Sequence, residues 1–211
     1  MKSVTVSEHP LVLHRLAQLR DKATPPPLFR RLVHDITQIL FVEASRDLRI
    51  AEVSVETPLT TCVGHRLSER VGLIPILRAG LGMADAILEM LPDAEVWHLG
   101  LYRDHTTHRP VTYYNKFDAA SSKLDRCFVV DPMLATGGSA IEAINILKAR
   151  HIHRVCYLGL IAAPEGVEAL RAAHPDAAIH LGALDGRLDE NKYIVPGLGD
   201  AGDRQFATFG E

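Results

Sequence analysis

The last two thirds of the chain alternate short apolar runs with helical patterns, and this alternation limits the fold more than any other feature. From residue 71 onward there are five apolar runs of strand length, and helical patterns lie between several of them. This order is typical of βαβ units, in which parallel strands are buried between helices. We therefore expect an α/β fold with a mostly parallel sheet flanked by helices. The expected strands are 71–77, 96–102, 127–131, 155–161 and 178–184, and the expected helices are 82–90, 138–149 and 165–173.

The first 50 residues have a different pattern, which we interpret as a helical arm. Val4 and Val6 lie in a short alternating stretch, and residues 11–19 have the pattern of an apolar helix. Thr24 is placed to cap a second helix, because the prolines that follow it are tolerated in a first helical turn. Such an arm either packs on the body of the protein or joins copies of the chain. The apolar face of the second helix is formed by Leu28, Leu32, Ile36, Ile39 and Leu40.

The composition excludes several classes of protein. With 211 residues, of which 47% are hydrophobic, the chain can bury a core without disulfides or a structural metal, and we expect one domain over 1–211. The net charge of -3 gives no general attraction to nucleic acid or to a membrane, so we expect neither as a partner. The chain has no apolar stretch approaching 18 residues and does not open on a signal segment, which indicates a cytoplasmic protein.

The cysteines and histidines do not have the spacing of a metal site. Cys62, Cys127 and Cys156 are odd in number and far apart, so we interpret them as reduced thiols in the core. His151 and His153 have no neighbouring carboxylates or thiols, and we expect them on a solvated turn. Trp97, which lies in an apolar run, is expected in the core.

A candidate phosphate site lies in the segment 127–139, CFVVDPMLATGGS. An apolar run ends at Asp131, a short turn follows, and two glycines open a helical pattern. The main-chain amides of 135–139 would converge on an anion at the positive end of that helix, with the hydroxyl groups of Thr136 and Ser139 as further donors. Asp131 is then placed for ribose hydroxyls. The alternative is an ordinary Gly-Gly turn, since neither the P-loop nor the dinucleotide pattern is present.

Arg78 follows the apolar run 71–77 directly and precedes Ala-Gly-Leu-Gly. The five donors of a guanidinium suit the oxygens of a diphosphate, so an arginine at the carboxyl end of a buried strand predicts a diphosphate contact. A structural ion pair, for example with Asp85, is the alternative.

Two further segments have the composition of parts of a pocket. The segment 193–204, YIVPGLGDAGDR, is poor in side chains, so its main-chain groups can read a flat heterocycle, unless it is a plain glycine-rich turn. The segment 103–116 is polar, basic and aromatic, and part of it has the pattern of half a hairpin. Loops of this length are often lids, although an exposed hairpin without a role is the alternative.

Four segments resemble the uracil phosphoribosyltransferases, a branch of the type I phosphoribosyltransferase family, and the resemblance covers nearly the whole chain. In chain order they are LRAGLGM, a hairpin with PVTYYNK, VVDPMLATGGS and YIVPGLGDAGDR. Pro132, where other type I members generally have a second acidic residue, is characteristic of the uracil branch. The resemblance implies the type I fold, with a helical arm over 1–50, a flexible hairpin over 103–118 and a uracil-binding hood over 185–211. His105 and His108 depart from the residues that are more usual in the hairpin.

The resemblance also implies the reaction and its partners. The 5-phosphoribosyl group of 5-phosphoribosyl 1-diphosphate (PRPP) would pass to uracil, giving UMP and diphosphate on the pyrimidine salvage route, with Mg2+ as cofactor. Members of the family are similar in being dimers or higher oligomers, so a homodimer or homotetramer is expected. Several bacterial members are activated by GTP, which makes GTP a candidate allosteric activator here.

Four residues are candidates for catalysis. We expect Arg78 and Arg103 to stabilise the leaving diphosphate and Asp131 to hold the ribose hydroxyls. Asp200 would reach the Mg2+ that PRPP carries, directly or through water, so we expect no metal site formed by protein alone. The candidate PRPP contacts are Arg78, Arg103, Asp131, Pro132, Met133, Leu134, Ala135, Thr136, Gly137, Gly138, Ser139 and Asp200, and the candidate uracil contacts are Ile194, Gly199, Asp200 and Ala201.

Two other functions compete with this interpretation. A protein of the same fold can be a regulator that binds an RNA leader, but such a role calls for a basic face, which the charge of -3 argues against. An enzyme of the same class can use a purine, but a purine enzyme is expected to have two adjacent acidic residues where this chain has Asp131 and Pro132.

Overall fold

A computed structural model describes the backbone of residues 4–103, 110–115 and 124–208, and the side chains of 4–100 and 124–208. Its main sheet has the strand order β1-β11-β10-β8-β4-β6-β7, with β5 beside β4 and β9 beside β10. All neighbours are parallel except β6 and β7. The strands of this sheet are β1 (Val4–Val6), β4 (Val71–Leu77), β5 (Glu95–Val96), β6 (Leu99–Arg103), β7 (Pro110–Asn115), β8 (Arg126–Val130), β9 (Met133–Leu134), β10 (Val155–Ala162) and β11 (Ala178–Leu184).

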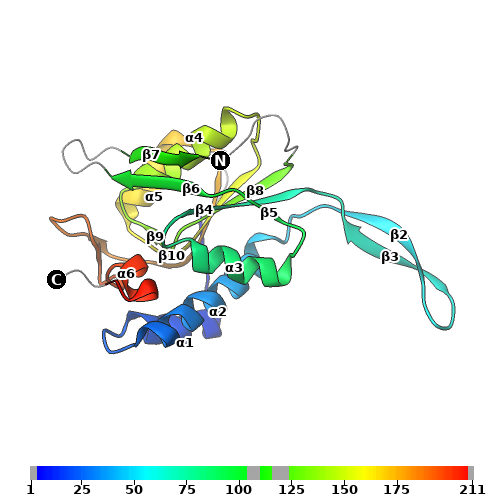
Figure 1. Ribbon diagram of the computed structural model, residues 1–211, viewed down its shortest axis with the longest axis horizontal. Helices are drawn as coiled ribbons and strands as arrows, with labels where there is room; N and C mark the ends of the chain where they lie inside the picture. The colour runs from blue at the N-terminus through cyan, green and yellow to red at the C-terminus, as the bar shows by residue number, and fades with distance from the viewer. Residues whose placement is uncertain (1–3, 104–109, 116–123, 209–211) are drawn as a thin grey trace.

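Helices cover both faces of this sheet, as Figure 1 shows, and the expected α/β fold is confirmed. One face packs against α1 (Pro10–Arg20), α2 (Pro26–Ala44) and α3 (Leu81–Met90). The other packs against α4 (Gly138–Lys148) and α5 (Pro164–Ala173). Every residue of β8 and of β10 is buried, which explains why these strands read as continuous apolar runs. The hood contains β12 (Arg187–Leu188), β13 (Ile194–Val195) and α6 (Ala201–Phe206).

The N-terminal helices belong to the core of the molecule. Phe29, Leu32 and Ile36 of α2 are fully buried against the sheet, and β1 is the edge strand next to β11. The expected cap is wrong, because α2 begins at Pro26 with Pro25 before it, and the Thr24 hydroxyl donates to the carbonyl of Gln18 instead. Three of the five residues expected on the apolar face, Leu32, Ile36 and Leu40, are buried as expected. Leu28 is exposed and Ile39 only partly buried, while Phe29 and Val33 are buried.

Three smaller expectations change in the structure. The run 96–102 forms two short strands, β5 and β6, rather than one. Trp97 lies between them, half-buried, and packs at the edge of the core. Cys62 is exposed, whereas Cys127 and Cys156 are buried as expected. His151 and His153 are exposed on the turn after α4, as expected.

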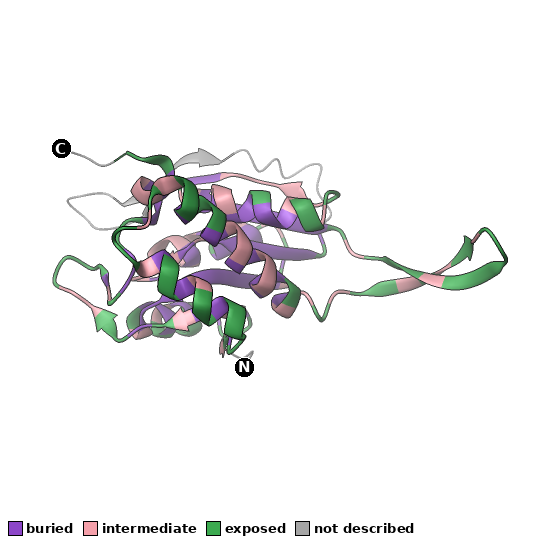
Figure 2. Ribbon diagram, turned by 90° about the horizontal axis from the view of Figure 1, so that it is seen from below, coloured by how far each residue is buried: buried purple, intermediate pink, exposed green. Residues whose placement is uncertain are grey.

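A two-stranded ribbon that the sequence did not reveal projects from the body (Figure 1). It is formed by the antiparallel strands β2 (Ile50–Glu56) and β3 (Thr61–Leu67), and we call residues 50–67 the β-ribbon. Figure 2 shows it extending away from the body, with most of its residues exposed. Because both faces of the β-ribbon meet solvent, its sequence has no buried run by which it can be recognised.

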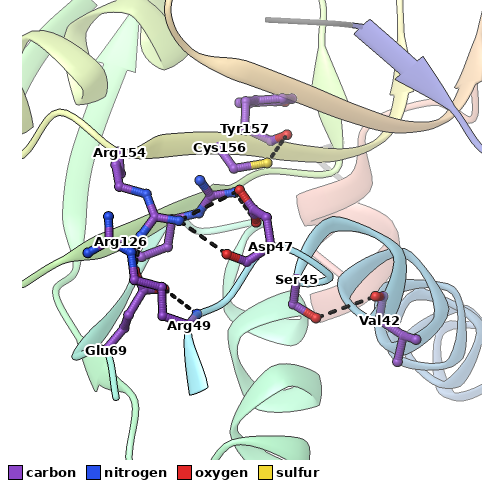
Figure 3. Close-up of polar contacts among 9 residues, drawn as sticks. All are labelled: Val42, Ser45, Asp47, Arg49, Glu69, Arg126, Arg154, Cys156 and Tyr157. Atoms are coloured by element: carbon purple, nitrogen blue, oxygen red, sulfur yellow. Dashed lines mark hydrogen bonds and ion pairs between the residues drawn. The ribbon is translucent and has the colours of Figure 1, made fainter. Parts of the chain in front are cut away.

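An ion-pair cluster fixes the base of the β-ribbon to the sheet (Figure 3). Glu69, whose side chain is 2% exposed, accepts from the main-chain N–H of Arg49 at 3.1 Å and pairs with the guanidinium groups of Arg49 and Arg154. Asp47 accepts from Arg126 at 3.1 Å. The β-ribbon therefore leaves the body in a direction set by charged residues at the amino ends of β8 and β10.

Candidate active site

The carboxyl ends of the parallel strands bring the candidate residues to one edge of the sheet. Arg78 directly follows β4, and Asp131 directly follows β8, the neighbouring strand. The turn after Arg78 lies against the end of β8, because a Cβ on Gly80 would meet the carbonyl oxygen of Val130 at 2.4 Å. Ligands of open parallel sheets bind at this edge.

The expected phosphate site is a tight turn between β9 and α4. Gly137 has φ +82, a conformation that favours glycine, and its carbonyl accepts the first hydrogen bond of α4, from Ile141 at 2.9 Å. The turn rests on α5, since a Cβ on Gly166 would lie 2.4 Å from the carbonyl oxygen of Ala135. The first N–H groups of α4 have no partner within the helix by geometry, so this end of α4 suits an anion.

Asp131 lies half-buried beside this turn. Burial, followed by the negative charge of Asp200, raises the pKa of its carboxyl group to about 7, although a hydrogen bond from the amide of Met133 opposes the shift. The influence of Asp200 on Asp131 means that the two carboxylates share one neighbourhood. Tyr157 of β10 donates its hydroxyl hydrogen to the main-chain carbonyl of Asp131 at 3.1 Å and so supports the end of β8.

Arg78 is held by the hood and not by Asp85. Its guanidinium donates to Asp203 at 3.1 Å and to the hydroxyl of Thr208 at 3.2 Å, while 54% of its side chain remains exposed. Asp85, the example given for the alternative of a structural ion pair, is exposed on α3, and the carboxylate that pairs with Arg78 is Asp203. An ion pair this exposed is weak, and a diphosphate can replace it.

The hood places Asp200 next to Arg78. Asp200 caps α6, accepting from the amide of Asp203 at 2.9 Å. A Cβ on Gly202 would lie 3.2 Å from an oxygen of Asp200 and 3.7 Å from a nitrogen of Arg78. The Gln205 side chain ties α6 to the turn after β4, because its amide donates to the carbonyl of Ala79 at 2.9 Å.

The glycine-rich segment of the hood is a sharply turned chain. Gly197 and Gly199 have φ +65 and φ +79, and Pro196 follows a cis peptide bond. Ile194 is buried in β13, and Ala201 opens α6. The candidate uracil contacts therefore lie on one continuous piece of backbone, from Ile194 to Ala201 at the start of α6.

Some of the expected residues lie outside the described part of the chain. Arg103 ends β6, but its side chain is outside the described residues. The same holds for His105 and His108, and for most of the hairpin 103–118, of which only the strand β7 is described beyond Arg103. The remaining candidates lie in the turns described above, at the carboxyl ends of β4 and β8, before α4 and in the hood.

Sequence reasoning missed the supporting residues of this site. Tyr157 was indistinguishable from an apolar strand residue, and Thr208 lies 130 positions from Arg78. Among the described residues, His, Cys, Asp and Glu side chains form no group of three that could hold a metal ion. Within the same residues, no helix is both long and apolar enough to cross a membrane.

Comparison with known proteins agrees with this geometry. A family model described as uracil phosphoribosyltransferase matches residues 6–208. The uracil phosphoribosyltransferase of Roseiflexus castenholzii is 58% identical over 208 residues, 99% of this chain and 100% of that one. That of Halalkalibacterium halodurans is 52% identical over 209 residues, with the same coverage.

Solved structures resemble the whole chain or a large part of it. A protein of Aquifex aeolicus has a TM-score of 0.91 at 32% identity, covering 98% of this chain and 99% of its own. A hypoxanthine phosphoribosyltransferase of Trypanosoma cruzi shares the fold alone, with a TM-score of 0.51 at 10% identity over 75% of each chain. The family match over nearly the full length, together with the grouped residues at the carboxyl edge, shows that this chain belongs to the uracil phosphoribosyltransferase family.

Proposed function

We propose that the carboxyl edge of the sheet is where this chain transfers the 5-phosphoribosyl group of PRPP to uracil, releasing diphosphate and forming UMP. The reaction is that of its family. The observation that carries the assignment of the site is the convergence of Arg78, Asp131 and Asp200 with the start of α4. An edge of this kind offers hydrogen-bond donors for an anion, a carboxylate that accepts from ribose hydroxyls, and a loop whose main chain can contact a base.

PRPP would bind across the first two turns of the edge. The main-chain amides of 135–139 and the hydroxyls of Thr136 and Ser139 would take its 5-phosphate at the positive end of α4. Asp131 would accept the ribose hydroxyls, and Arg78 together with Arg103 would take the diphosphate. Pro132, Met133 and Leu134 form the backbone that joins the ribose and phosphate positions.

Displacement of the diphosphate develops positive charge on the ribose ring and negative charge on the leaving group, as in glycosyl transfer generally. Asp131 then favours the cationic ring, and Arg78 moves from Asp203 to the leaving oxygens. Because both charged groups already lie at this edge, they lower the barrier with no reorganisation beyond this change of partner by Arg78. The residues act by electrostatics and positioning, and none forms a covalent bond to substrate.

Uracil would lie against the glycine-rich segment of the hood. The main chain of Ile194 and the amides of Gly199 and Ala201 would read O2, N3–H and O4 of the base. Cytosine presents an amino group where uracil presents O4, which sets a donor against a donor and costs about 1 to 3 kcal/mol. The proposed reading groups therefore favour uracil.

The residues present fit a Mg2+ ion carried by PRPP. The carboxylates of Asp131 and Asp200 repel each other, and a divalent cation relieves this repulsion. Two carboxylates are fewer ligands than an all-protein site for the ion needs, whereas substrate oxygens and water complete its shell. When bound, the ion neutralises charge on the diphosphate.

A panel of bases with PRPP and Mg2+, followed by diphosphate release, tests the proposal. We expect turnover with uracil and at least tenfold lower kcat/KM with cytosine, and no turnover with purines. The Asp131→Asn and Arg78→Ala variants should lose most of this activity. Near-normal kcat/KM in both variants would contradict the placement of the active site at this edge.

We propose that the chain is a homo-oligomer, a homodimer or homotetramer, in which a second copy covers the β-ribbon. A two-stranded ribbon is marginally stable alone in water, and this one exposes apolar side chains on its surface. Leu59 at the tip is 95% exposed. The others are Ile50, Val55, Val63 and Leu67. Sedimentation of the Leu59→Asp variant should show weaker association than the parent chain, and unchanged association would exclude the β-ribbon as the interface.

Two further proposals rest on the family resemblance and on composition. GTP is proposed as an allosteric activator, and initial rates at subsaturating PRPP with and without GTP test this. A cytoplasmic location is supported by the buried thiols of Cys127 and Cys156, since reduced cysteines are typical of that compartment.

A further inference from the structure

Both polar main-chain groups of Gly197, its N–H and its carbonyl, form hydrogen bonds with charged side chains. Its N–H donates to a carboxylate oxygen of Asp185 at 2.9 Å, and its carbonyl accepts from the guanidinium of Arg20 at 2.7 Å. Gly197 has φ +65, and a Cβ there would lie 2.1 Å from the carbonyl oxygen of Ile194. The turn is therefore restricted to glycine and depends on two charged side chains from elsewhere in the chain.

Arg20 and Asp185 also bind each other. Two nitrogens of Arg20 donate to the two oxygens of Asp185 at 2.7 and 2.5 Å, in the fork geometry that makes Arg–carboxylate pairs strong. The Asp185 side chain is 4% exposed and that of Arg20 is 23% exposed. Arg20 is the last residue of α1, and Asp185 directly follows β11. The pair thus connects the N-terminal helix, the edge of the sheet and the hood.

Arg204 forms a second connection to the same helix. Its guanidinium donates to the carbonyl of Leu198 at 2.8 Å, of Leu19 at 2.9 Å and of Asp21 at 2.6 Å, and lies 4.4 Å from the ring centre of Phe29. Carbonyl groups at the end of a helix lack intrahelical partners, so they attract such a cation. Both Gly197 and Leu198 are therefore tied to the end of α1.

We propose that Arg20, Asp185 and Arg204 are positioning residues that set the location of the base-reading loop for uracil. This inference rests on the proposed function. Ile194 and Leu198 pack in the core, but Gly197 and Gly199 have no side chain to pack, so the position of their main-chain groups also depends on polar contacts from other elements. Arg20 and Arg204 hold Gly197 and Leu198, which lie between the proposed reading groups Ile194 and Gly199. A displacement of about 1 Å can cost 100-fold in rate, which makes this anchoring consequential.

The test compares Arg20→Ala with Arg15→Ala. Arg15 is a matched control, because it also lies on α1 and also forms an ion pair, with Asp35 at 2.7 Å, at a similar exposure of 33%. We expect Arg20→Ala to raise the KM for uracil about tenfold or more and to lower the preference for uracil over cytosine, while the KM for PRPP stays within twofold. Arg15→Ala should leave all three quantities unchanged.

Two conservative variants separate positioning from a loss of fold. Arg20→Lys keeps the charge but cannot make the fork and the Gly197 contact together, so its KM for uracil should lie between those of the parent and Arg20→Ala. Arg204→Lys should raise the KM for uracil in the same way. If Arg20→Ala does not fold, the KM values for uracil of the two lysine variants test the positioning role in its place.

The outcomes also separate this inference from the proposed function. Absence of diphosphate release by the parent chain with uracil would overturn the proposed function. A parent that turns over uracil, with unchanged KM for uracil in Arg20→Ala, or in both lysine variants where that variant does not fold, would overturn the positioning role alone.

Discussion

Arg78 combines a functional position with a weak structural one. Its ion pair with Asp203 is half-exposed, and pairs of this kind contribute about 0 to 1 kcal/mol to stability. Loss of a preorganised charge contact in an active site costs about 3 to 4 kcal/mol of barrier. We expect Arg78→Ala to lower kcat by 100- to 1000-fold while the free energy of unfolding in urea changes by less than about 1 kcal/mol. A large loss of stability with normal turnover would reverse the assignment.

At the proposed site, we expect Asp131 to make binding of PRPP depend on pH near neutrality. Its carboxyl has a pKa of about 7 in the protein without substrate, raised mainly by burial, and only the ionised form is an acceptor on both oxygens. We expect kcat/KM for PRPP to fall as the pH drops below about 7, since this ratio reports the free enzyme. Asp131→Asn serves as the control for titration of PRPP itself. A parent profile that follows the variant profile would contradict the prediction.

The same carboxyl also affects stability, with a definite sign. The folded protein holds the Asp131 proton more tightly than the unfolded chain does. The protonated carboxyl therefore contributes to the free energy of unfolding, and this contribution is complete below pH 4 and is lost as the pH rises through about 7. In Asp131→Asn this loss is absent. We expect the variant to match the parent near pH 4 and to exceed it at pH 8 by on the order of 1 kcal/mol, measured by urea unfolding. A constant difference across this range would show that Asp131 does not titrate as stated.

At the scale of elements, the phosphate turn depends on how closely α5 approaches it. A Cβ on Gly166 would collide with two carbonyl oxygens, those of Leu134 at 2.6 Å and of Ala135 at 2.4 Å. We expect Gly166→Ala to cost about 1 to 3 kcal/mol of stability and to raise the KM for PRPP, because the turn must move. Gly186→Ala is the control, since a Cβ on Gly186 would lie 3.5 Å from the carbonyl oxygen of Val195, an ordinary contact distance. Equal effects of both variants would argue against a tight contact between the turn and α5.

Elements could be predicted where burial leaves a pattern. The strands β4 and β11 begin and end at the expected residues, since β4 is an apolar run between two arginines and β11 is a mainly apolar run that ends before Asp185. The β-ribbon was missed because its residues alternate in space without a buried face, and its turn contains no Asn-Gly or Asp-Gly pair. The prediction that Cys62 is buried was wrong for the same reason, because apolar neighbours in the sequence do not by themselves bury a residue in the structure.

The site could be predicted in part for a related reason. Arg78 and Asp131 follow buried runs directly, and the carboxyl ends of parallel strands meet at one edge. The contact of Arg78 with Asp203 and the anchors of the hood join residues more than 100 positions apart. No local pattern records such pairs, because they depend on how the finished sheet is packed.

For the whole molecule, Cys62 is a reporter of association. It is the exposed thiol of the three and lies in the β-ribbon, whereas burial raises the pKa of the Cys127 thiol to about 12 and keeps it unreactive. We expect one thiol per chain to react rapidly with a disulfide reagent at low protein concentration, and its rate to fall as the concentration rises. Cys62→Ser should abolish the fast phase. A rate that is independent of concentration would mean that the β-ribbon stays open to solvent.

The pairing of β1 with β11 has a consequence for synthesis of the chain. β1 lies beside a strand that begins at residue 178, and Arg20 pairs with Asp185, a residue 165 positions further along the chain. During synthesis, β1 and α1 therefore lack these neighbours until β11 and the residue after it have been translated. We expect the β1 edge of the sheet and the contacts of α1 with the hood to form only after that point, so the apolar faces of the N-terminal helices stay uncovered until then.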